Sequence, residues 1–214
     1  MGKVEQGGKC LRVGLTGGIA SGKTLVAAML EVCGAPVAFA DAMARGLMER
    51  PGEVRERLTE LLGAGAYLPD GSLDRAALGA RLFADDALLS RVNAIVHPAV
   101  GRAAAAWHAA QLPLTPYTVY ESALLFETGA YREFDVVVLV HAPREQRIAR
   151  ATARDGVDAE AVIARMDAQW TDAQRLEVEA YRILNDGSAS LIAQVWRLHR
   201  TLVAAHAQAS SHRR

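Results

Sequence analysis

The stretch GGIASGKT, at residues 17–24, decides the fold that we expect for this 214-residue chain. It matches the phosphate-binding pattern GxxxxGK[ST], whose glycines let the backbone curl until successive amide N–H groups point at phosphate oxygens. A short apolar run, residues 11–16, precedes it, and the helix-like sequence LVAAML follows it. A glycine-rich turn that arose by chance would rarely stand between a strand and a helix. The sequence therefore predicts a site for a nucleoside triphosphate.

Each part of this loop has an expected task. Lys23 can reach the β and γ phosphates, and the Thr24 hydroxyl can coordinate Mg²⁺. The helix that follows contributes the positive end of its dipole. The residues that we expect to line the nucleotide site are Gly17, Gly18, Ile19, Ala20, Ser21, Gly22, Lys23, Thr24 and Leu25.

Charge and composition narrow the classes of partner. The chain has 24 basic and 24 acidic residues, so no overall field draws it to nucleic acid or to anionic lipid. Hydrophobic residues make up 51% of it, but no run approaches the length of a membrane span, and its first residues lack the apolar stretch of a secretory signal. We expect a cytoplasmic protein with small-molecule substrates and without nucleic-acid or membrane partners. The oligomeric state stays open, with a monomer favoured.

Five short β-rich runs alternate with helix-length segments, at residues 11–16, 36–40, 117–121, 134–140 and 181–184. The run VVVLV at residues 136–140 is the clearest, since a near-continuous branched apolar sequence is typical of a strand buried on both faces. The alternation predicts an α/β protein of the three-layer P-loop NTPase class. Its mainly parallel five-stranded sheet would carry helices on both faces.

Strand signals vanish between residues 45 and 112, and the pattern there becomes helical. Asp74 is a candidate helix cap, and YLPDGS at residues 67–72 is typical of a turn. We expect a single domain over residues 1–214, with its core at 11–44 and 113–205. The helical insertion at 45–112 would bind the acceptor substrate, and a lid would span about residues 144–172. Beyond Leu202 we expect the end of the chain to fray.

The remaining motifs favour a small-molecule kinase over a nucleotide switch. Switches of this class need DxxG and NKxD elements, and the sequence contains neither. A kinase needs a carboxylate near the acceptor hydroxyl. The second expected strand ends in Asp41, at the edge of the sheet where the phosphate loop lies. Asp41 is therefore a candidate general base, although a cap of a helix at residues 42–48 is an equally good interpretation, and the two roles are compatible.

Four arginines, at positions 144, 147, 150 and 154, share one face of the helix expected after the fourth strand. A solvated basic face is the default explanation of such spacing. Kinases of this architecture carry their lid at this place, and guanidinium groups on a lid stabilise the charge of a phosphoryl group in transfer. We favour the lid, above all for Arg150 and Arg154.

Glu121 closes the third expected strand. An acid at this place can hold a water on Mg²⁺, but Glu121 could equally pair with a neighbouring arginine.

Taken in order, six blocks of sequence resemble the dephospho-coenzyme A kinase family: LTGGIASGKT, FADAMAR, NAIVHPAV, YESALLFETG, APREQRIARATARDG and ILNDGS. The resemblance covers roughly residues 11–202. It implies transfer of the γ phosphate of ATP to the ribose 3′ hydroxyl of dephospho-coenzyme A, the last step of coenzyme A synthesis. It also implies a nucleotide-binding core, a helical acceptor-binding region and a lid.

Carried over to this sequence, the resemblance assigns residues 17–24 to ATP and Mg²⁺, Asp41 to the acceptor hydroxyl, and Arg150 and Arg154 to the lid. Arg45 and His97 match positions on the acceptor side, although His97 could instead satisfy a helix kink at Pro98. Lys23, Asp41, Arg150 and Arg154 are thus the expected catalytic residues.

Two positions depart from the family pattern. Phe39 stands where many members carry a second acid, and Ala123 stands where they carry a proline. Two other functions remain open: another small-metabolite or nucleoside monophosphate kinase of the same core, and a nucleotide-binding module without catalysis.

Overall fold

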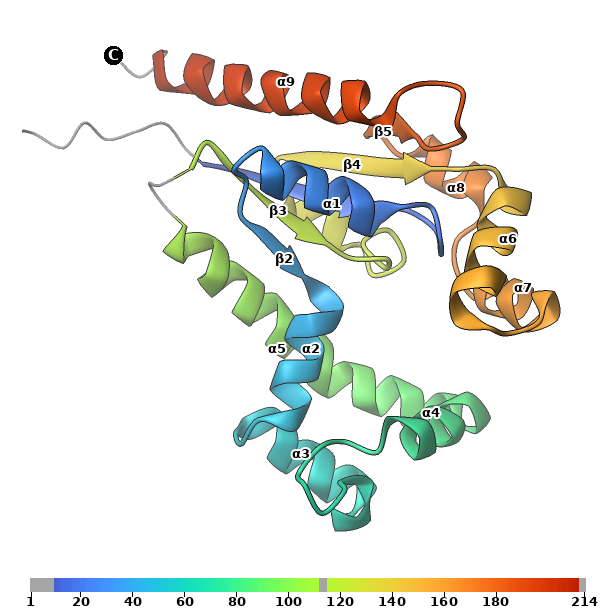
Figure 1. Ribbon diagram of the computed structural model, residues 1–214. Helices are drawn as coiled ribbons and strands as arrows, with labels where there is room; N and C mark the ends of the chain where they lie inside the picture. Colours follow the sequence, from blue (N-terminus) through green and yellow to red (C-terminus); the bar gives the residue numbers. More distant parts are fainter. Residues whose placement is uncertain (1–9, 112–114, 212–214) are drawn as a thin grey trace, which may run out of the picture. The chain divides into compact units, whose positions relative to one another are not determined.

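The computed structural model describes residues 10–111 and 115–211 (Figure 1). The chain forms two compact units. The second unit is Phe39–Ala110, and the first is made of the chain before and after it.

The first unit is built on one five-stranded sheet in the order β2-β3-β1-β4-β5. β1 (Leu11–Thr16) pairs in parallel with β3 (Tyr117–Glu121) and with β4 (Val136–His141), and β4 pairs in parallel with β5 (Tyr181–Leu184). β2 (Val37–Phe39) forms the edge beside β3. The predicted fold class is confirmed, and the bounds of β1, β3 and β5 match the expected runs.

Helices and one irregular segment cover this sheet. α1 (Lys23–Val32) and α9 (Leu191–Ser211) contact each other and the strands (Figure 1). At the centre of β1, a Cβ at Gly14 would meet Leu125 and Phe134, so the segment after β3 packs closely there with its 3₁₀ turn η2 (Ala130–Glu133). The strands between these layers carry fully buried branched residues, Val13, Val119, Val138 and Val140 among them.

α9 corrects one expectation. The end of the chain was expected to fray beyond Leu202, but α9 continues to Ser211. Val195, Leu198 and Leu202 anchor its buried stripe, and the alanine-rich sequence VAAHAQA that follows has high helix propensity, which lets the helix run on. None of the helices within the described ranges is both long and apolar enough to span a bilayer.

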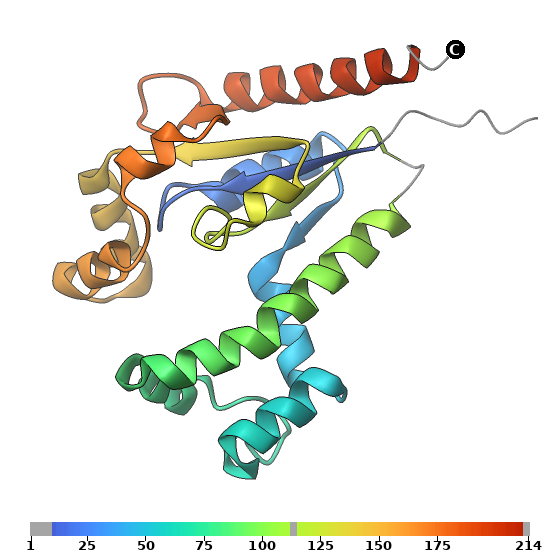
Figure 2. The same ribbon diagram turned by 180° about the vertical axis from the view of Figure 1, so that it is seen from behind.

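The second unit is helical (Figure 2). It contains α2 (Ala40–Glu49), α3 (Glu53–Leu62), the 3₁₀ turn η1 (Ala64–Ala66), α4 (Arg75–Ala84) and α5 (Asp86–Ala110). α5 is its spine and contacts the other three α-helices. Buried residues on α5 recur at helical spacing, namely Val92, Ile95, Val96, Ala99 and Val100.

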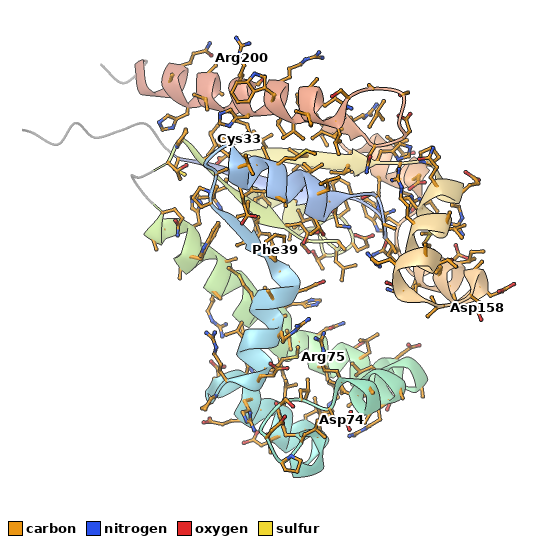
Figure 3. The ribbon with its side chains drawn as sticks, viewed as in Figure 1. Cys33, Phe39, Asp74, Arg75, Asp158 and Arg200 are labelled. Atoms are coloured by element: carbon orange, nitrogen blue, oxygen red, sulfur yellow. The ribbon has the colours of Figure 1, made fainter. Side chains whose placement is uncertain are left out.

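Local signals set the ends of these helices. Asp74 caps α4, as predicted, because its Oδ1 accepts a hydrogen bond from the Ala77 amide at 3.0 Å (Figure 3). The expected turn at residues 67–72 is also present, with Asp70 Oδ1 accepting from the Ser72 amide at 2.9 Å.

Candidate active site

The phosphate loop lies between β1 and α1, as its motif predicted. Two of its glycines have backbone angles that other residues rarely adopt: φ is 152° at Gly17 and 100° at Gly22, which is the N-cap of α1. At Gly17 a Cβ would also collide with the carbonyl oxygen of Val140 on β4. Ala20 has a positive φ of 56°. The loop therefore follows a tight path that depends on these glycines.

Lys23 closes the loop from inside. Its Nζ donates to the carbonyl oxygens of Gly17 at 2.9 Å and of Gly18 at 3.2 Å, and the residue is buried. Thr24 and Leu25, the next two residues of α1, are exposed. The ammonium group is thus held at the start of the loop, while the residue next to it, Thr24, is exposed.

Asn185, just after β5, fixes the other end of the loop. Its Nδ2 donates to the carbonyl oxygen of Ser21 at 2.8 Å, and a Cβ at Gly22 would collide with the same amide group. The backbone carbonyl of Asn185 accepts a hydrogen bond from Arg150 Nη2 at 2.9 Å. The structure therefore brings Arg150 into one hydrogen-bonded chain with the loop, through Asn185.

α6 (Arg144–Asp155) carries both predicted lid arginines. Arg150 is partly buried and also bonds the Gln146 side chain at 3.1 Å. Arg154 is exposed and forms two hydrogen bonds to Asp155, at 2.7 and 3.1 Å. These two hydrogen bonds raise the pKa of Arg154. Together with one from Arg165 at 2.9 Å, they lower the pKa of Asp155 to about 2.

The helices of this region pack directly on the phosphate loop. α7 (Ala159–Asp167) is capped by Asp158, whose Oδ1 accepts from the Ala161 amide at 2.8 Å (Figure 3). Ala151 on α6 and Val162 and Met166 on α7 form a buried cluster, against which Ile19 and Ala20 pack. The middle of the loop is thus in apolar contact with α6 and α7.

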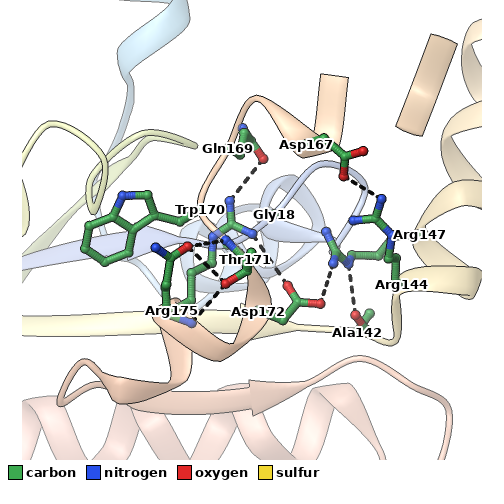
Figure 4. Close-up of polar contacts among 12 residues, drawn as sticks. Gly18, Ala142, Arg144, Arg147, Asp167, Gln169, Trp170, Thr171, Asp172 and Arg175 are labelled. Carbon is green, nitrogen blue, oxygen red and sulfur yellow. Dashed lines mark hydrogen bonds and ion pairs between the residues drawn. The ribbon is translucent and has the colours of Figure 1, made fainter. Parts of the chain in front are cut away.

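For Arg147 the default alternative to the lid was a solvated basic face, but the residue is almost fully buried. Its Nε donates to the Ala142 carbonyl at 3.0 Å, and its Nη2 pairs with Asp172 at 2.6 Å (Figure 4). Burial lowers the pKa of Arg147, and the Asp172 carboxylate opposes that shift. A solvated face is therefore the wrong interpretation at this position.

Sequence reasoning missed the other members of this ion-pair network, which are Asp172, Arg175 and Glu127. Asp172 begins α8 (Asp172–Glu177), whose buried Arg175 pairs with Glu127 at 3.0 Å. Glu127 lies in the YESALLFETG block, but no spacing rule connects it with a helix that begins 45 residues later.

Glu121 is the last residue of β3, at the carboxyl ends of the parallel strands, where β1 leads into the phosphate loop. It is the register partner of Leu15 and is buried. Its neighbour Ser122 donates a backbone hydrogen bond to Leu15 at 3.0 Å. A carboxylate is therefore held beside the end of the loop-bearing strand.

Asp41, Arg45 and His97 belong to the second unit, and all three are exposed. Two expectations about Asp41 were wrong. β2 ends at Phe39, and α2 already begins at Ala40, so Asp41 lies in the first turn of the helix and is neither a strand end nor its cap. Within the described part of the second unit, no hydrogen bond or ion pair engages the Asp41 carboxylate. His97 precedes Pro98 in α5, which continues through the proline.

Together, the glycine-dependent loop between β1 and α1, the inward-turned Lys23 and the parallel sheet define a P-loop nucleotide-binding protein. The family model for dephospho-CoA kinase matches residues 11–190. The chain therefore belongs to the dephospho-CoA kinase family and is an ATP-dependent kinase.

Individual relatives agree with this assignment. The dephospho-CoA kinase of Thermobifida fusca is 40% identical over 198 residues, which cover 88% of this chain and 98% of the relative. That of Bacteroides fragilis is 35% identical over 188 residues, covering 88% and 91%. Among solved structures, TT1252 from Thermus thermophilus superposes with a TM-score of 0.78 at 34% identity, covering 92% of this chain and 97% of that one. The Campylobacter jejuni dephospho-CoA kinase shares the fold, with a TM-score of 0.67 at 22% identity over 91% of this chain and 98% of its own.

Proposed function

We propose that this chain transfers the γ phosphate of ATP to the ribose 3′ hydroxyl of dephospho-CoA and releases CoA and ADP. Membership of the family supports the reaction. The observation that carries it in this chain is the phosphate loop, with Lys23 Nζ seated on the Gly17 and Gly18 carbonyls and Asn185 fixed on Ser21. A loop held at both ends is preorganised for a polyphosphate, so little ordering remains when ATP binds.

The residues of the first unit would bind the nucleotide and balance its charge. The amides of residues 17–25 would receive the phosphates, and Lys23 would move its ammonium group from the loop carbonyls to the β and γ oxygens. Arg150 and Arg154 would stabilise the phosphoryl group in transfer, an effect that can reach about 10³-fold or more for an arginine so placed. Arg154 would exchange Asp155 for phosphate oxygens to do so.

Mg²⁺ would neutralise charge on the β and γ phosphates. The donors of this chain fit that ion: the hydroxyl of Thr24, an exposed residue on the first turn of α1, and the Glu121 carboxylate at the end of β3. Magnesium in nucleotide sites is held by one or two protein oxygens together with phosphates and waters. The described residues contain no cluster of three His, Cys, Asp or Glu side chains suited to an all-protein metal site.

Residues of the second unit would serve the acceptor. Asp41 is the proposed general base for the 3′ hydroxyl, because its carboxylate is exposed and engages no described group of its own unit. Arg45, one turn further along α2, and His97 on α5 would contact the phosphate groups of dephospho-CoA. We further propose that the protein works as a monomer in the cytoplasm.

Purified protein incubated with ATP, Mg²⁺ and dephospho-CoA tests the proposal. We expect CoA and ADP in equal amounts, and a much lower kcat/KM for other acceptors such as nucleoside monophosphates or shikimate. A well-folded enzyme that turns over another acceptor better would make it a different kinase of this fold. Binding of ATP without turnover of any acceptor would leave a nucleotide-binding module.

The Lys23→Ala variant is the matching control. Loss of the ammonium group removes a cation that would contact the β and γ phosphates, so we expect kcat/KM to fall by about 10²-fold or more. The thermal midpoint of unfolding should stay close to that of the wild type.

A further inference from the structure

Two buried guanidinium groups converge on Gly18, the second residue of the phosphate loop (Figure 4). A Cβ built at Gly18 would collide with Nη1 of Arg147 and lie 3.0 Å from Nη1 of Arg175. Both arginines are 3% exposed. Gly18 is not among the residues with positive φ, so its φ does not by itself exclude an alanine. What excludes a side chain at Gly18 is the pair of arginines.

A network of ion pairs holds the guanidinium groups of Arg147 and Arg175 in place. Asp172 accepts from Arg147 Nη2 at 2.6 Å and lies 3.5 Å from Arg175 Nη1. Arg175 Nη2 donates to Glu127 at 3.0 Å and to the Gln169 side chain at 3.1 Å. Glu127 Oε1 also accepts the Trp170 amide at 3.0 Å. This network thus connects α6, α8 and the segment after β3 with one residue of the phosphate loop, Gly18.

The ion pair between Arg175 and Glu127 does not have the geometry that would stabilise the fold most. The strongest arginine–carboxylate pair is a two-point fork. Here Nε of Arg175 and Oε2 of Glu127 are buried and have no hydrogen-bond partner within residues 10–111 and 115–211. The guanidinium is instead turned so that Nη1 faces Asp172 and Gly18. Buried ion pairs also contribute little net stability compared with apolar packing.

We propose that Arg147 and Arg175 are positioning residues of the phosphate loop, which hold the Gly18 backbone and thereby set the affinity for the triphosphate. The Gly18 carbonyl accepts hydrogen bonds from Lys23 Nζ and from the Ser21 amide, both at 3.2 Å. A shift of Gly18 therefore moves the anchor of Lys23 and the turn of the loop together. The inference rests on the proposed function only in that the loop binds ATP.

A double-mutant cycle tests the contact itself. Gly18→Ala forces a methyl group into the Arg147 guanidinium and should weaken ATP binding, and Arg147→Ala should weaken it by releasing Gly18. In the double variant the methyl group fills space that the arginine has left. We expect the fold-loss of ATP affinity in the double variant to be smaller, by about five-fold or more, than the product of the fold-losses in the two single variants. Losses that simply multiply would overturn the proposal.

Substitutions at Arg175 separate positioning from folding. We expect Arg175→Gln to raise the KM for ATP about ten-fold and to leave the KM for dephospho-CoA within two-fold. Arg175→Lys should lie in between, because it keeps the charge but replaces the separate Nη1 and Nη2 donors by one ammonium group. Arg182→Gln is the matched control. Arg182 is exposed, donates one hydrogen bond to the Leu176 carbonyl at 2.8 Å and should leave both constants unchanged. Kinetics are measured well below the lowest thermal midpoint of the set.

A lower thermal midpoint of Arg175→Gln with an unchanged KM for ATP would make the network merely structural and sink the proposal. Affinities are measured by calorimetry with ATP alone, without an acceptor. Absence of turnover with dephospho-CoA would then count against the proposed function only, whereas the Gly18 and Arg175 results still decide this inference.

Discussion

Asn185 Nδ2 donates to the Ser21 carbonyl at 2.8 Å and joins two residues that are 164 positions apart in the sequence. The backbone of Asn185 is itself fixed, because its amide donates to the His141 carbonyl at 2.8 Å. Its own carbonyl receives Arg150 Nη2 at 2.9 Å. One residue just after β5 therefore contacts the phosphate loop and α6 at the same time.

This relationship predicts that Asn185→Ala weakens ATP binding by about 2- to 10-fold, the range of one hydrogen bond with a part-buried carbonyl left unpaired. Asn185→Asp should lose more, because a carboxylate cannot donate and adds negative charge beside the phosphates. Calorimetric titration with ATP measures both. Ser188→Ala breaks only the local turn with Asp186 and should bind normally. Wild-type affinity of Asn185→Ala would show that the amide does not order the loop.

Asp41→Asn tests the proposed base. The amide keeps the shape of the side chain but cannot accept a proton, so we expect kcat to fall by about 10²- to 10⁴-fold with ATP affinity unchanged. Asp74→Asn is the control within the same unit, since asparagine caps a helix as well as aspartate does. An Asp41→Asn enzyme with full activity would remove Asp41 from the proton transfer.

The sheet and the loop were predictable because their signals are local. β1 and β3 are short, largely buried runs, which is typical of parallel strands inside a sheet. β5 lies at the edge of the sheet with only Ile183 buried, and the turn residues that follow it mark where it ends. The glycines and Lys23 of the loop follow a fixed spacing that reflects contacts within eight residues. Asp74 as a helix cap is equally local.

What the sequence could not provide depends on residues distant along the chain. The spacing of the arginines on α6 gives their shared face but not what covers it, and Arg147 is covered by Asp172 of α8. The start of α2 was misplaced because Phe39, its N-cap, has no capping side chain to mark it. The role of Asn185 toward Ser21 likewise arises only when β5 lies in the sheet beside β4.

The pair of Arg154 with Asp155 predicts a pH dependence of stability. Hydrogen bonds from Arg154 and Arg165 lower the pKa of Asp155 from its ordinary 3.8 to about 2. Because the folded pKa lies below the unfolded one, the pair stabilises the folded protein above pH 4, and this contribution is lost as the pH falls from about 4 to 2. We expect the thermal midpoint of Asp155→Asn to lie below that of the wild type at pH 6, with a gap that narrows toward pH 2.

Arg165→Gln removes one of the two arginines that donate to Asp155, whose hydrogen bond is 2.9 Å long. The thermal midpoint of this variant should differ less from that of the wild type than does that of Asp155→Asn, with the same pH trend. A gap that stays constant from pH 6 to pH 2 would mean that the Asp155 carboxylate is not stabilised by these arginines.

Glu121→Gln decides between the two interpretations of this buried acid. If the carboxylate holds magnesium through a water, loss of its charge should raise the half-saturating Mg²⁺ concentration by about 10-fold or more, as it does for other groups that orient metal ligands. Thr24→Ala should act in the same direction, and Glu133→Gln, which removes an exposed carboxylate 3.9 Å from Arg12, should not. The readouts are activity and calorimetric ADP binding, each titrated with Mg²⁺. An unchanged magnesium requirement together with a lower thermal midpoint would assign Glu121 to a structural ion pair instead.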